Sequence, residues 1–201
     1  MGTSIIYRNI YIYRIVMNIL YRMKYQARFN DIIDLIKDSD TTILELCFGD
    51  TLIAQTCKER GIEWIGYDIN EYFVSNAKAK GFNATKQDIS ELEKLPQADL
   101  CIMCGSLYHF IPEIEMTLNK MLTSSSRIII SEPIKNLSSN NGMIGKISRI
   151  LTNAGKGHEN FRFDRSSIIE TLEKYKKSQN YTYKIISTKR DILIEINHDR
   201  N

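Results

Sequence analysis

Short hydrophobic runs alternate with segments of helical periodicity along most of the chain. The runs TTILELC (41–47), EWIGYD (63–68) and ADLCIMC (98–104) are typical of strands that are buried in a sheet. Between them, apolar residues recur at spacings of three and four in TLIAQTCKER (51–60) and NEYFVSNAKAK (70–80), which predicts helices. Because strands alternate with helices, the pattern predicts an open, doubly wound α/β sheet, mostly parallel, with helices on both faces.

The rest of the chain extends this pattern. Further strands are expected at 82–87, 126–132, 181–188 and 191–197, and further helices at 29–37, 112–122 and 166–177, with a short helical turn around Ser90 to Lys94. Gly81 is expected to end the helix that precedes it. Lys189 and Arg190 join the last two strands as in a hairpin, so an antiparallel edge is predicted.

The N-terminal segment is apolar and aromatic, yet arginines and asparagines interrupt it. Apolar residues at helical spacing predict an amphipathic helix, namely Ile5, Ile12, Ile15, Val16, Ile19 and Leu20. No apolar run approaches the roughly 20 residues of a membrane span, and the small-residue cleavage site of a secretory signal is missing. Two interpretations stay open: a helix packed on the domain, which is favoured, and a helix that also contacts a membrane surface through its basic residues and tyrosines.

Composition indicates one globular domain. The 201 residues are 43% hydrophobic and 25% charged, and the formal charge of +3 gives no strong field toward nucleic acid. Four cysteines do not form a disulfide framework in a chain of this size, so reduced thiols in a cytoplasmic protein are expected. Cys101 and Cys104 are spaced as C-x-x-C without a second ligand pair, so no metal site is predicted.

Chemistry-bearing residues follow the predicted strands, where open α/β sheets bind ligands. The first strand ends in Glu45-Leu-Cys-Phe-Gly49-Asp50-Thr51, a turn in which Asp50 or Thr51 could cap the next helix. Asp68 ends the second strand, 19 positions after Gly49 (68 − 49), the separation at which an acidic residue meets ribose hydroxyls. The third strand ends in Gln87-Asp88-Ile89, suited to an adenine ring, and the fourth in Cys104-Gly105-Ser106-Leu107-Tyr108-His109-Phe110.

A nicotinamide-binding Rossmann domain does not fit the first turn. Such a domain carries G-x-G-x-x-G, and this chain places Cys47, Gly49 and Leu52 at the three glycine positions.

In this order, the motifs resemble those of class I S-adenosylmethionine-dependent methyltransferases, over roughly residues 20–135. The resemblance implies a Rossmann-like, seven-stranded sheet with N-terminal helices and S-adenosyl-L-methionine as cofactor. It places Glu45 near the methionine part, Asp68 on the ribose, and Asp88 with Ile89 at the adenine. The turn departs from the family's E/D-x-G-x-G-x-G, since Cys47 replaces the first glycine and Thr51 the third.

The resemblance also suggests that Tyr25 and Arg28 close over the methionine end. Tyr21, Tyr25 and Arg28 are spaced by four and three and are expected on one helix face, and the Arg28 guanidinium suits a carboxylate. The cofactor-binding residues expected in total are Tyr25, Arg28, Glu45, Cys47, Phe48, Gly49, Thr51, Asp68, Ile69, Asp88, Ile89, Cys104, Gly105 and Ser106.

Candidate acceptor-side residues lie after the fourth and fifth strands. His109 is a candidate general base because its side chain titrates near neutral pH; the alternative is that it begins the next helix and hydrogen-bonds the backbone. Tyr108, Glu132 and Arg162 are candidate substrate contacts. We divide the single domain into N-terminal helices or lid (1–40), cofactor-binding core (41–134), substrate lid (135–165), and final helix and hairpin (166–201).

The function expected is methyl transfer to a small molecule, such as a sugar, a lipid headgroup or another metabolite, with oxygen slightly favoured as acceptor. Alternatives are a noncatalytic, methyltransferase-like binding protein and an RNA methyltransferase. Nucleic acid is not the favoured partner, because the segment after the fourth strand lacks an Asn-Pro-Pro-Tyr type turn and has no dense basic patch nearby. An anionic substrate is compatible with the basic residues of the substrate lid.

Overall fold

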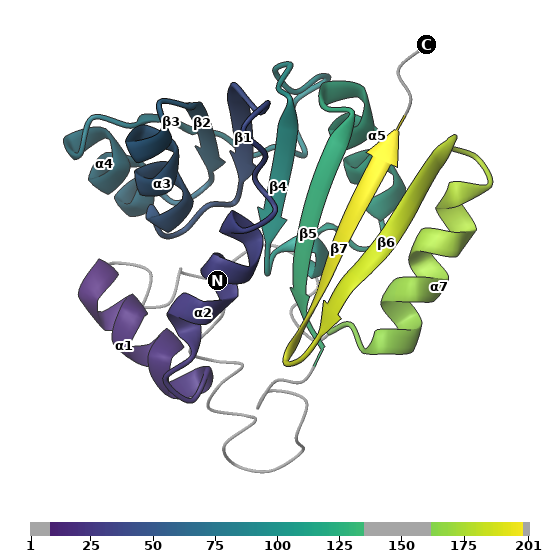
Figure 1. Cartoon of the computed structure of the whole chain (residues 1–201), viewed down its shortest axis with the longest axis horizontal. Helices are drawn as coiled ribbons and strands as arrows, with labels where there is room; N and C mark the ends of the chain where they lie inside the picture. Colours follow the sequence, from purple (N-terminus) through teal and green to yellow (C-terminus); the bar gives the residue numbers. More distant parts are fainter. Residues whose placement is uncertain (1–8, 135–161, 199–201) are drawn as a thin grey trace.

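A seven-stranded sheet forms the centre of the computed structural model, which describes residues 9–134 and 162–198. The strand order is β3-β2-β1-β4-β5-β7-β6 (Figure 1). The strands are β1 (Thr42–Leu46), β2 (Glu63–Asp68), β3 (Asn83–Lys86), β4 (Leu100–Cys104), β5 (Arg127–Pro133), β6 (Tyr181–Thr188) and β7 (Asp191–His198). Strands β1 to β5 pair in parallel, and β7 pairs antiparallel with both β5 and β6. The predicted fold class, including the antiparallel hairpin, is confirmed.

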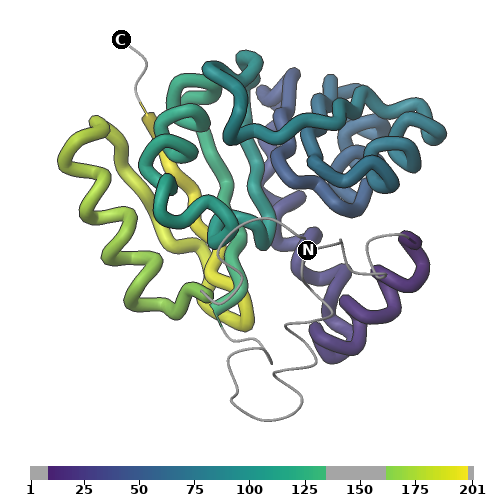
Figure 2. Tube along the Cα trace, turned by 180° about the vertical axis from the view of Figure 1, so that it is seen from behind, coloured from purple at the N-terminus to yellow at the C-terminus, as the bar shows by residue number. Residues whose placement is uncertain are grey.

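Helices cover both faces of this sheet, which divides the hydrophobic core in two. They are α1 (Ile10–Leu20), α2 (Tyr25–Ile33), α3 (Leu52–Arg60), α4 (Glu71–Ala79), α5 (Ile114–Ser124) and α7 (Arg165–Lys176), with a short 3₁₀ helix η2 (Leu107–Phe110). One core cluster joins the sheet to α5 and α7, and the other joins it to α1, α2, α3 and α4. Figure 2 shows the path of the chain around the sheet from behind. Because both faces are covered, the central strands β1 and β4 are almost entirely buried.

Local side-chain chemistry sets several element boundaries. The Asn70 side chain caps α4 by accepting from the amide groups of Tyr72 and Phe73, and Gly81 follows this helix with φ +80°. The helical turn expected around Ser90 to Lys94 is wrong: this segment forms turns and bends. The Asp88 carboxylate accepts from both the amide and the hydroxyl of Ser90, which favours a local turn over a helix.

The N-terminal helices differ most from the prediction. Arg22 and Met23 have φ +48° and +62°, so the chain turns sharply and Tyr21 caps α1 while Tyr25 begins α2. The expected helix at 29–37 instead begins earlier and ends at Ile33. One helix face therefore does not present Tyr21, Tyr25 and Arg28 together. The turn nevertheless brings the rings of Tyr21 and Tyr25 to 5.9 Å between centroids.

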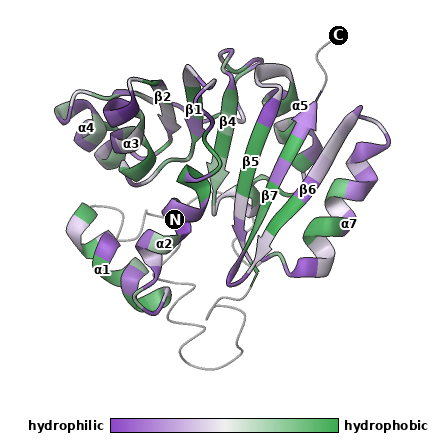
Figure 3. Cartoon of the chain, viewed as in Figure 1, coloured by the Kyte–Doolittle hydropathy of each residue, from purple (hydrophilic) through white to green (hydrophobic). Residues whose placement is uncertain are grey.

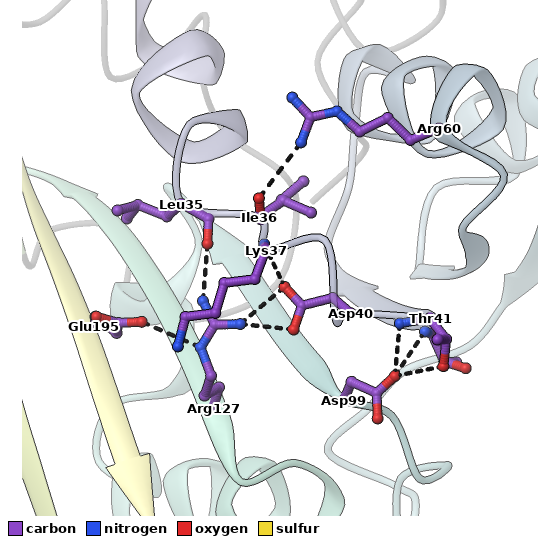
Figure 4. A network of polar contacts seen from close by, with 10 residues as sticks. Leu35, Ile36, Lys37, Asp40, Thr41, Arg60, Asp99, Arg127 and Glu195 are labelled. Atoms are coloured by element: carbon purple, nitrogen blue, oxygen red, sulfur yellow. Dashed lines mark hydrogen bonds and ion pairs between the residues drawn. The ribbon is translucent and has the colours of Figure 1, made fainter.

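A buried polar network fastens the amino end of the sheet (Figure 4). Arg127, the first residue of β5, donates to both Asp40 oxygens at 2.7 and 2.8 Å and to the carbonyl of Leu35 at 2.8 Å. It also donates to Glu195 at 3.2 Å. Nearby, Asp99 accepts from the amide groups of Thr41 and Thr42. These contacts hold the loop after α2 against β5 and β7, at the end of the sheet opposite the carboxyl ends of β1 and β2.

Candidate functional site

The turn after β1 has a left-handed backbone at two positions. Cys47 and Gly49 both have φ +55°. Cys47 thus keeps the conformation that glycine adopts most easily, although it carries a side chain. A β-carbon added to Gly49 would lie 3.4 Å from the Tyr13 hydroxyl, so α1 covers this turn closely.

Asp68, at the end of β2, lies directly beside this turn. One carboxylate oxygen accepts from the Gly49 amide at 2.9 Å, and the other accepts from the Asn70 amide at 2.8 Å. Burial raises the pKa of Asp68 to about 6, although these backbone hydrogen bonds lower it. A carboxylate oxygen can accept more than one hydrogen bond, so Asp68 can also receive hydroxyl groups. The next residue, Ile69, leaves 37% of its surface exposed.

Other residues of the turn form its buried support. Glu45 is fully buried, accepts from Trp64 Nε1 at 2.8 Å, and has a pKa well above its usual value because of burial. Its other oxygen, Oε1, is buried without a hydrogen-bond partner. Phe48 packs edge-on against Trp64, with centroids 5.2 Å apart. Glu45 and Phe48 therefore lie on the buried side of the turn, where they support it.

Helix capping in this turn differs from the expectation. Neither Asp50 nor Thr51 caps α3 through its side chain: the Thr51 hydroxyl accepts from Lys80 at 2.8 Å. Buried Asp50 instead receives two hydrogen bonds from Arg14 of α1, at 2.7 and 2.8 Å. The turn after β1 is therefore tied to α1 by a bidentate ion pair.

The predicted adenine residues lie at the end of β3. Asp88 is half-buried, and its Oδ1 accepts from Ser90. Ile89 is 4% exposed and packs in the core. Exposed Ile69 is therefore better placed than Ile89 to offer an apolar surface to a ligand.

Arg28 reaches the carboxyl ends of β4 and β5 from α2. Its Nε forms an ion pair with Asp191, and its Nη2 donates to the Ser131 carbonyl at 3.3 Å. The guanidinium lies against Gly105, which has φ +68° and no side chain to obstruct it. Tyr25, 3% exposed, lies between Tyr13 and Tyr21 in a series of edge-on aromatic contacts.

The thiols beside this cluster are uncharged. Burial raises the pKa of Cys104 to about 12, although Arg28 lowers it. Burial also raises the pKa of Cys47 well above its usual value, and a hydrogen bond with Ser106 lowers it. All four cysteines are free.

The candidate acceptor-side residues gather around η2. Glu132, 1% exposed, accepts from the Leu107 amide at 3.0 Å, and its Oε1 is buried without a hydrogen-bond partner. Burial raises the pKa of Glu132 to about 8, while Arg28 and Leu107 lower it. The Arg162 guanidinium lies 3.9 Å from the centre of the Tyr108 ring, and the rings of Tyr108 and His109 are 3.9 Å apart.

His109 lies within η2 and does not begin α5, which starts at Ile114. The expected substrate lid falls mostly outside the described residues, which resume at 162.

Three further residues of the site were not singled out from the sequence. Tyr13 and Arg14 contact the turn after β1, and Asp191 is the partner of Arg28. The sequence could not predict the contacts of Tyr13 and Arg14, because they arise only when α1 folds over the turn after β1. Asp191 starts the last strand, 163 positions from Arg28 (191 − 28), and only the sheet order brings them together.

Comparison with known proteins identifies the fold. Neither a protein-family model nor a curated protein matches the sequence. Solved structures do match: the plantazolicin methyltransferase BpumL, in complex with a pentazolic desmethylPZN analog and SAH, has a TM-score of 0.68 at 14% identity, over 94% of this chain and 91% of that one. A SAM-dependent methyltransferase from Archaeoglobus fulgidus has a TM-score of 0.66 at 19% identity, over 92% and 99% of the two chains.

A third match is the 16S rRNA methylase RmtB, with a TM-score of 0.54 at 15% identity, over 86% of this chain and 63% of that one. At these identities the likeness concerns the fold. The chain has the fold of S-adenosylmethionine-dependent methyltransferases, and the named proteins with this fold differ in what they act on.

Proposed function

We propose that the chain is a methyltransferase that uses S-adenosyl-L-methionine and methylates a small molecule. The observation that carries this proposal is the position of Asp68. It stands at the carboxyl end of β2, beside the left-handed turn at Gly49, in a sheet with the methyltransferase strand order. A carboxylate at this point can receive both hydroxyls of a ribose.

The surrounding residues fit the other parts of the cofactor. Exposed Ile69 offers an apolar surface for the adenine ring, and Asp88 lies at the end of the neighbouring strand. Arg28, beside Gly105, can exchange part of its contact with Asp191 for the cofactor's carboxylate. The buried Oε1 of Glu45 has no hydrogen-bond partner in the described part of the protein, so it can pair with the methionine part of the cofactor.

The cofactor supplies an electrophilic methyl group on a sulfonium, so the chain's own task is alignment and proton removal. His109 and Glu132 lie on adjoining segments, and the Glu132 carboxyl, whose pKa burial raises to about 8, keeps its proton near neutral pH and can donate a hydrogen bond to a substrate. We assign the proton from an acceptor hydroxyl to His109 and a substrate-orienting role to Glu132. Arg162, held over Tyr108, provides a cation for an anionic acceptor.

The enclosed position of the site favours a small acceptor over RNA. Tyr13 lies over the first turn and Tyr25 packs edge-on against Tyr13, and both rings are largely withdrawn from solvent. The fold is shared with rRNA methylases, so methylation of total RNA is the competing outcome to measure. The noncatalytic alternative rests on Cys47 in the glycine turn; its φ of +55° argues that the turn keeps its shape.

Calorimetric titration with S-adenosylmethionine and its demethylated product tests the cofactor. Binding is expected in the wild type, and Asp68→Ala should weaken it by about 1.5 to 3 kcal/mol, the range for a hydrogen bond to a charged group. Asp99→Ala is the matched control, because Asp99 accepts backbone hydrogen bonds at the other end of the sheet. No binding by folded wild-type protein would contradict the proposal, as would equal losses in the two variants.

A further inference from the structure

We propose that the outward face of α1 docks on an anionic lipid surface. The face, here called the α1 stripe, consists of five large hydrophobic residues between 42% and 78% exposed: Tyr11, Ile12, Ile15, Ile19 and Met23. Positions 11, 15 and 19 are spaced by four along α1, so their side chains lie on one face of the helix, and Met23 follows in the turn after it. This proposal goes beyond the proposed methyltransferase activity and does not depend on it.

The α1 stripe is unusual within this molecule. The described residues contain seven exposed large hydrophobic side chains, and the other two lie apart from α1: Ile69 directly after β2, and Met116 on α5. Helix α1 lies at the periphery of the molecule, and hydrophobic residues occur along its length (Figure 3). An apolar concentration of this kind on a surface marks an interaction site.

The inward face of α1 is already packed, so the stripe is not a core face turned outward. Ile10 is buried, and Tyr13, Met17 and Leu20 pack against the cluster that includes α2 and α3. Arg14 is engaged by Asp50. The helix is therefore apolar on two sides, and only one of them finds a partner in the described part of the chain.

Charge identifies the occupant. Residues 1–30 contain five basic residues and no Asp or Glu: Arg8, Arg14, Arg22, Lys24 and Arg28. Arg22 and Lys24 are exposed on either side of Met23, and no ion pair between described residues engages them. In a two-fold interface with a second copy of the chain, Arg22 and Lys24 would face the same positive residues of the other copy and repel them. Anionic lipid headgroups would instead attract them.

Dimensions favour a helix that lies in the lipid interface. With 11 residues, α1 is about 16 Å long, about half of a bilayer's hydrocarbon thickness. Across the described ranges, no helix has the length and apolarity needed to span a membrane. An apolar row flanked by basic residues is the pattern of interfacial helices. Since Tyr13 and Arg14 contact the turn after β1, docking would bring the cofactor turn within about one helix diameter, roughly 10 Å, of the headgroups.

Sedimentation with lipid vesicles tests the proposal without cofactor or acceptor. Full-length protein should co-sediment with vesicles of phosphatidylcholine mixed with phosphatidylglycerol, much less with phosphatidylcholine alone, and less at high salt. The double variant Ile15→Glu/Ile19→Glu should bind at least about tenfold more weakly, because two side chains no longer enter the interface. Arg22→Gln/Lys24→Gln should lose about fivefold for each basic residue removed.

Met116→Glu is the matched control, since it introduces the same charge at an exposed hydrophobic position of α5 and should bind as the wild type does. Circular dichroism melts confirm that each variant is folded. In a second measurement, Ile15→Trp should show a blue-shifted fluorescence with anionic vesicles, whereas Met116→Trp should not.

Two results would overturn the proposal. One is wild-type protein that stays in the supernatant with anionic vesicles and is monomeric, which would leave the stripe solvated or covered by the chain itself. The other is a dimer that Ile15→Glu/Ile19→Glu separates, with no vesicle binding, which would assign the stripe to a second copy.

Discussion

Two buried arginines, at opposite ends of the sheet, differ in how completely the protein surrounds them. The Arg127 side chain, 11% exposed, is engaged by both oxygens of Asp40, by Glu195 and by a backbone carbonyl (Figure 4). The Arg28 side chain, 7% exposed, has the Asp191 ion pair and one longer hydrogen bond. Arg127 is fixed by partners on two segments, the loop after α2 and β7. Arg28 instead stands beside Gly105 and near Glu132, whose Oε1 has no hydrogen-bond partner among the described residues.

Under the proposed function, this difference is the one between a structural network and a ligand site. Buried polar groups are normally satisfied, so unpartnered oxygens call for an explanation. Glu45 and Glu132 each have one, and both end strands at the carboxyl edge. The groups around Arg127 show the arrangement expected when polar residues only hold segments together, while the carboxyl ends of β1 and β5 retain hydrogen-bonding capacity that a bound molecule can use.

The largest effect expected is on stability, from Arg127. Arg127→Met leaves Asp40 buried without its cation, which should lower the free energy of unfolding by about 3 to 5 kcal/mol. The affinity for S-adenosylhomocysteine should not change in the protein that remains folded. Arg28→Met is the counterpart: it also leaves a buried aspartate, Asp191, without its cation and should lower stability, but it should in addition reduce the affinity for S-adenosylhomocysteine, which Arg127→Met should leave unchanged. Denaturant unfolding measures the stability of both variants, and calorimetry measures their affinity for S-adenosylhomocysteine. If both variants lost the same stability and the same affinity, the contrast between the two arginines would be wrong.

The buried carboxyl group of Glu132 should make stability depend on pH. Its pKa is about 8 in the folded protein, above its ordinary value of 4.5, so the folded state holds the proton more tightly than the unfolded state between these values. The ligand-free protein should therefore lose stability, on the order of a few kcal/mol, as pH rises from about 4.5 to about 8. Glu132→Gln should flatten this slope. Urea unfolding across this pH range would contradict the account if the two proteins lost stability equally.

His109 should affect turnover and not folding. If it removes the acceptor's proton, His109→Ala should lower turnover by roughly 10²-fold or more, with cofactor affinity unchanged. Saturating single-turnover assays on an identified acceptor measure this loss. An unchanged rate would return His109 to a structural role within η2.

The smallest effect is expected from the ion pair that ties α1 to the turn. The Arg14 side chain is 39% exposed, so solvent screens its contact with Asp50. Arg14→Gln should weaken cofactor binding by less than about 1 kcal/mol. A loss as large as that of Asp68→Ala would mean that α1 itself holds the cofactor.

The sheet was predictable from the apolar patterns of its strands and from the turn residues between them. Features that depend on contacts between residues far apart in the sequence were not. The strand patterns predicted all seven strands, including β3, of whose four residues only Ala84 is buried, and Lys189 with Arg190 marked the hairpin. The break between α1 and α2 was not predictable, because Arg22 and Met23 adopt left-handed conformations that such residues rarely take.

The candidate site likewise has a part that the sequence predicted and a part that it did not. Asp68, Gly49 and Gly105 follow strands and were predicted to lie at one edge, where the structure places them. The roles of Asp50 and Asp191 depend on which arginine reaches each of them, and sequence spacing carries no such information. Ile69, not Ile89, presents the apolar surface, because a position just beyond a strand end can be exposed while the equivalent one in the next connection packs inward.

A crystal structure with bound S-adenosylhomocysteine tests the central claim most directly. The account predicts the ribose hydroxyls within hydrogen-bonding distance of the Asp68 carboxylate, the adenine against Ile69, and the carboxylate of the ligand beside Arg28. Arg127 should keep the contacts it has without ligand. A ligand bound elsewhere, or one that leaves Asp68 and Arg28 with only their present partners, would contradict the assignment of the carboxyl end as the cofactor site.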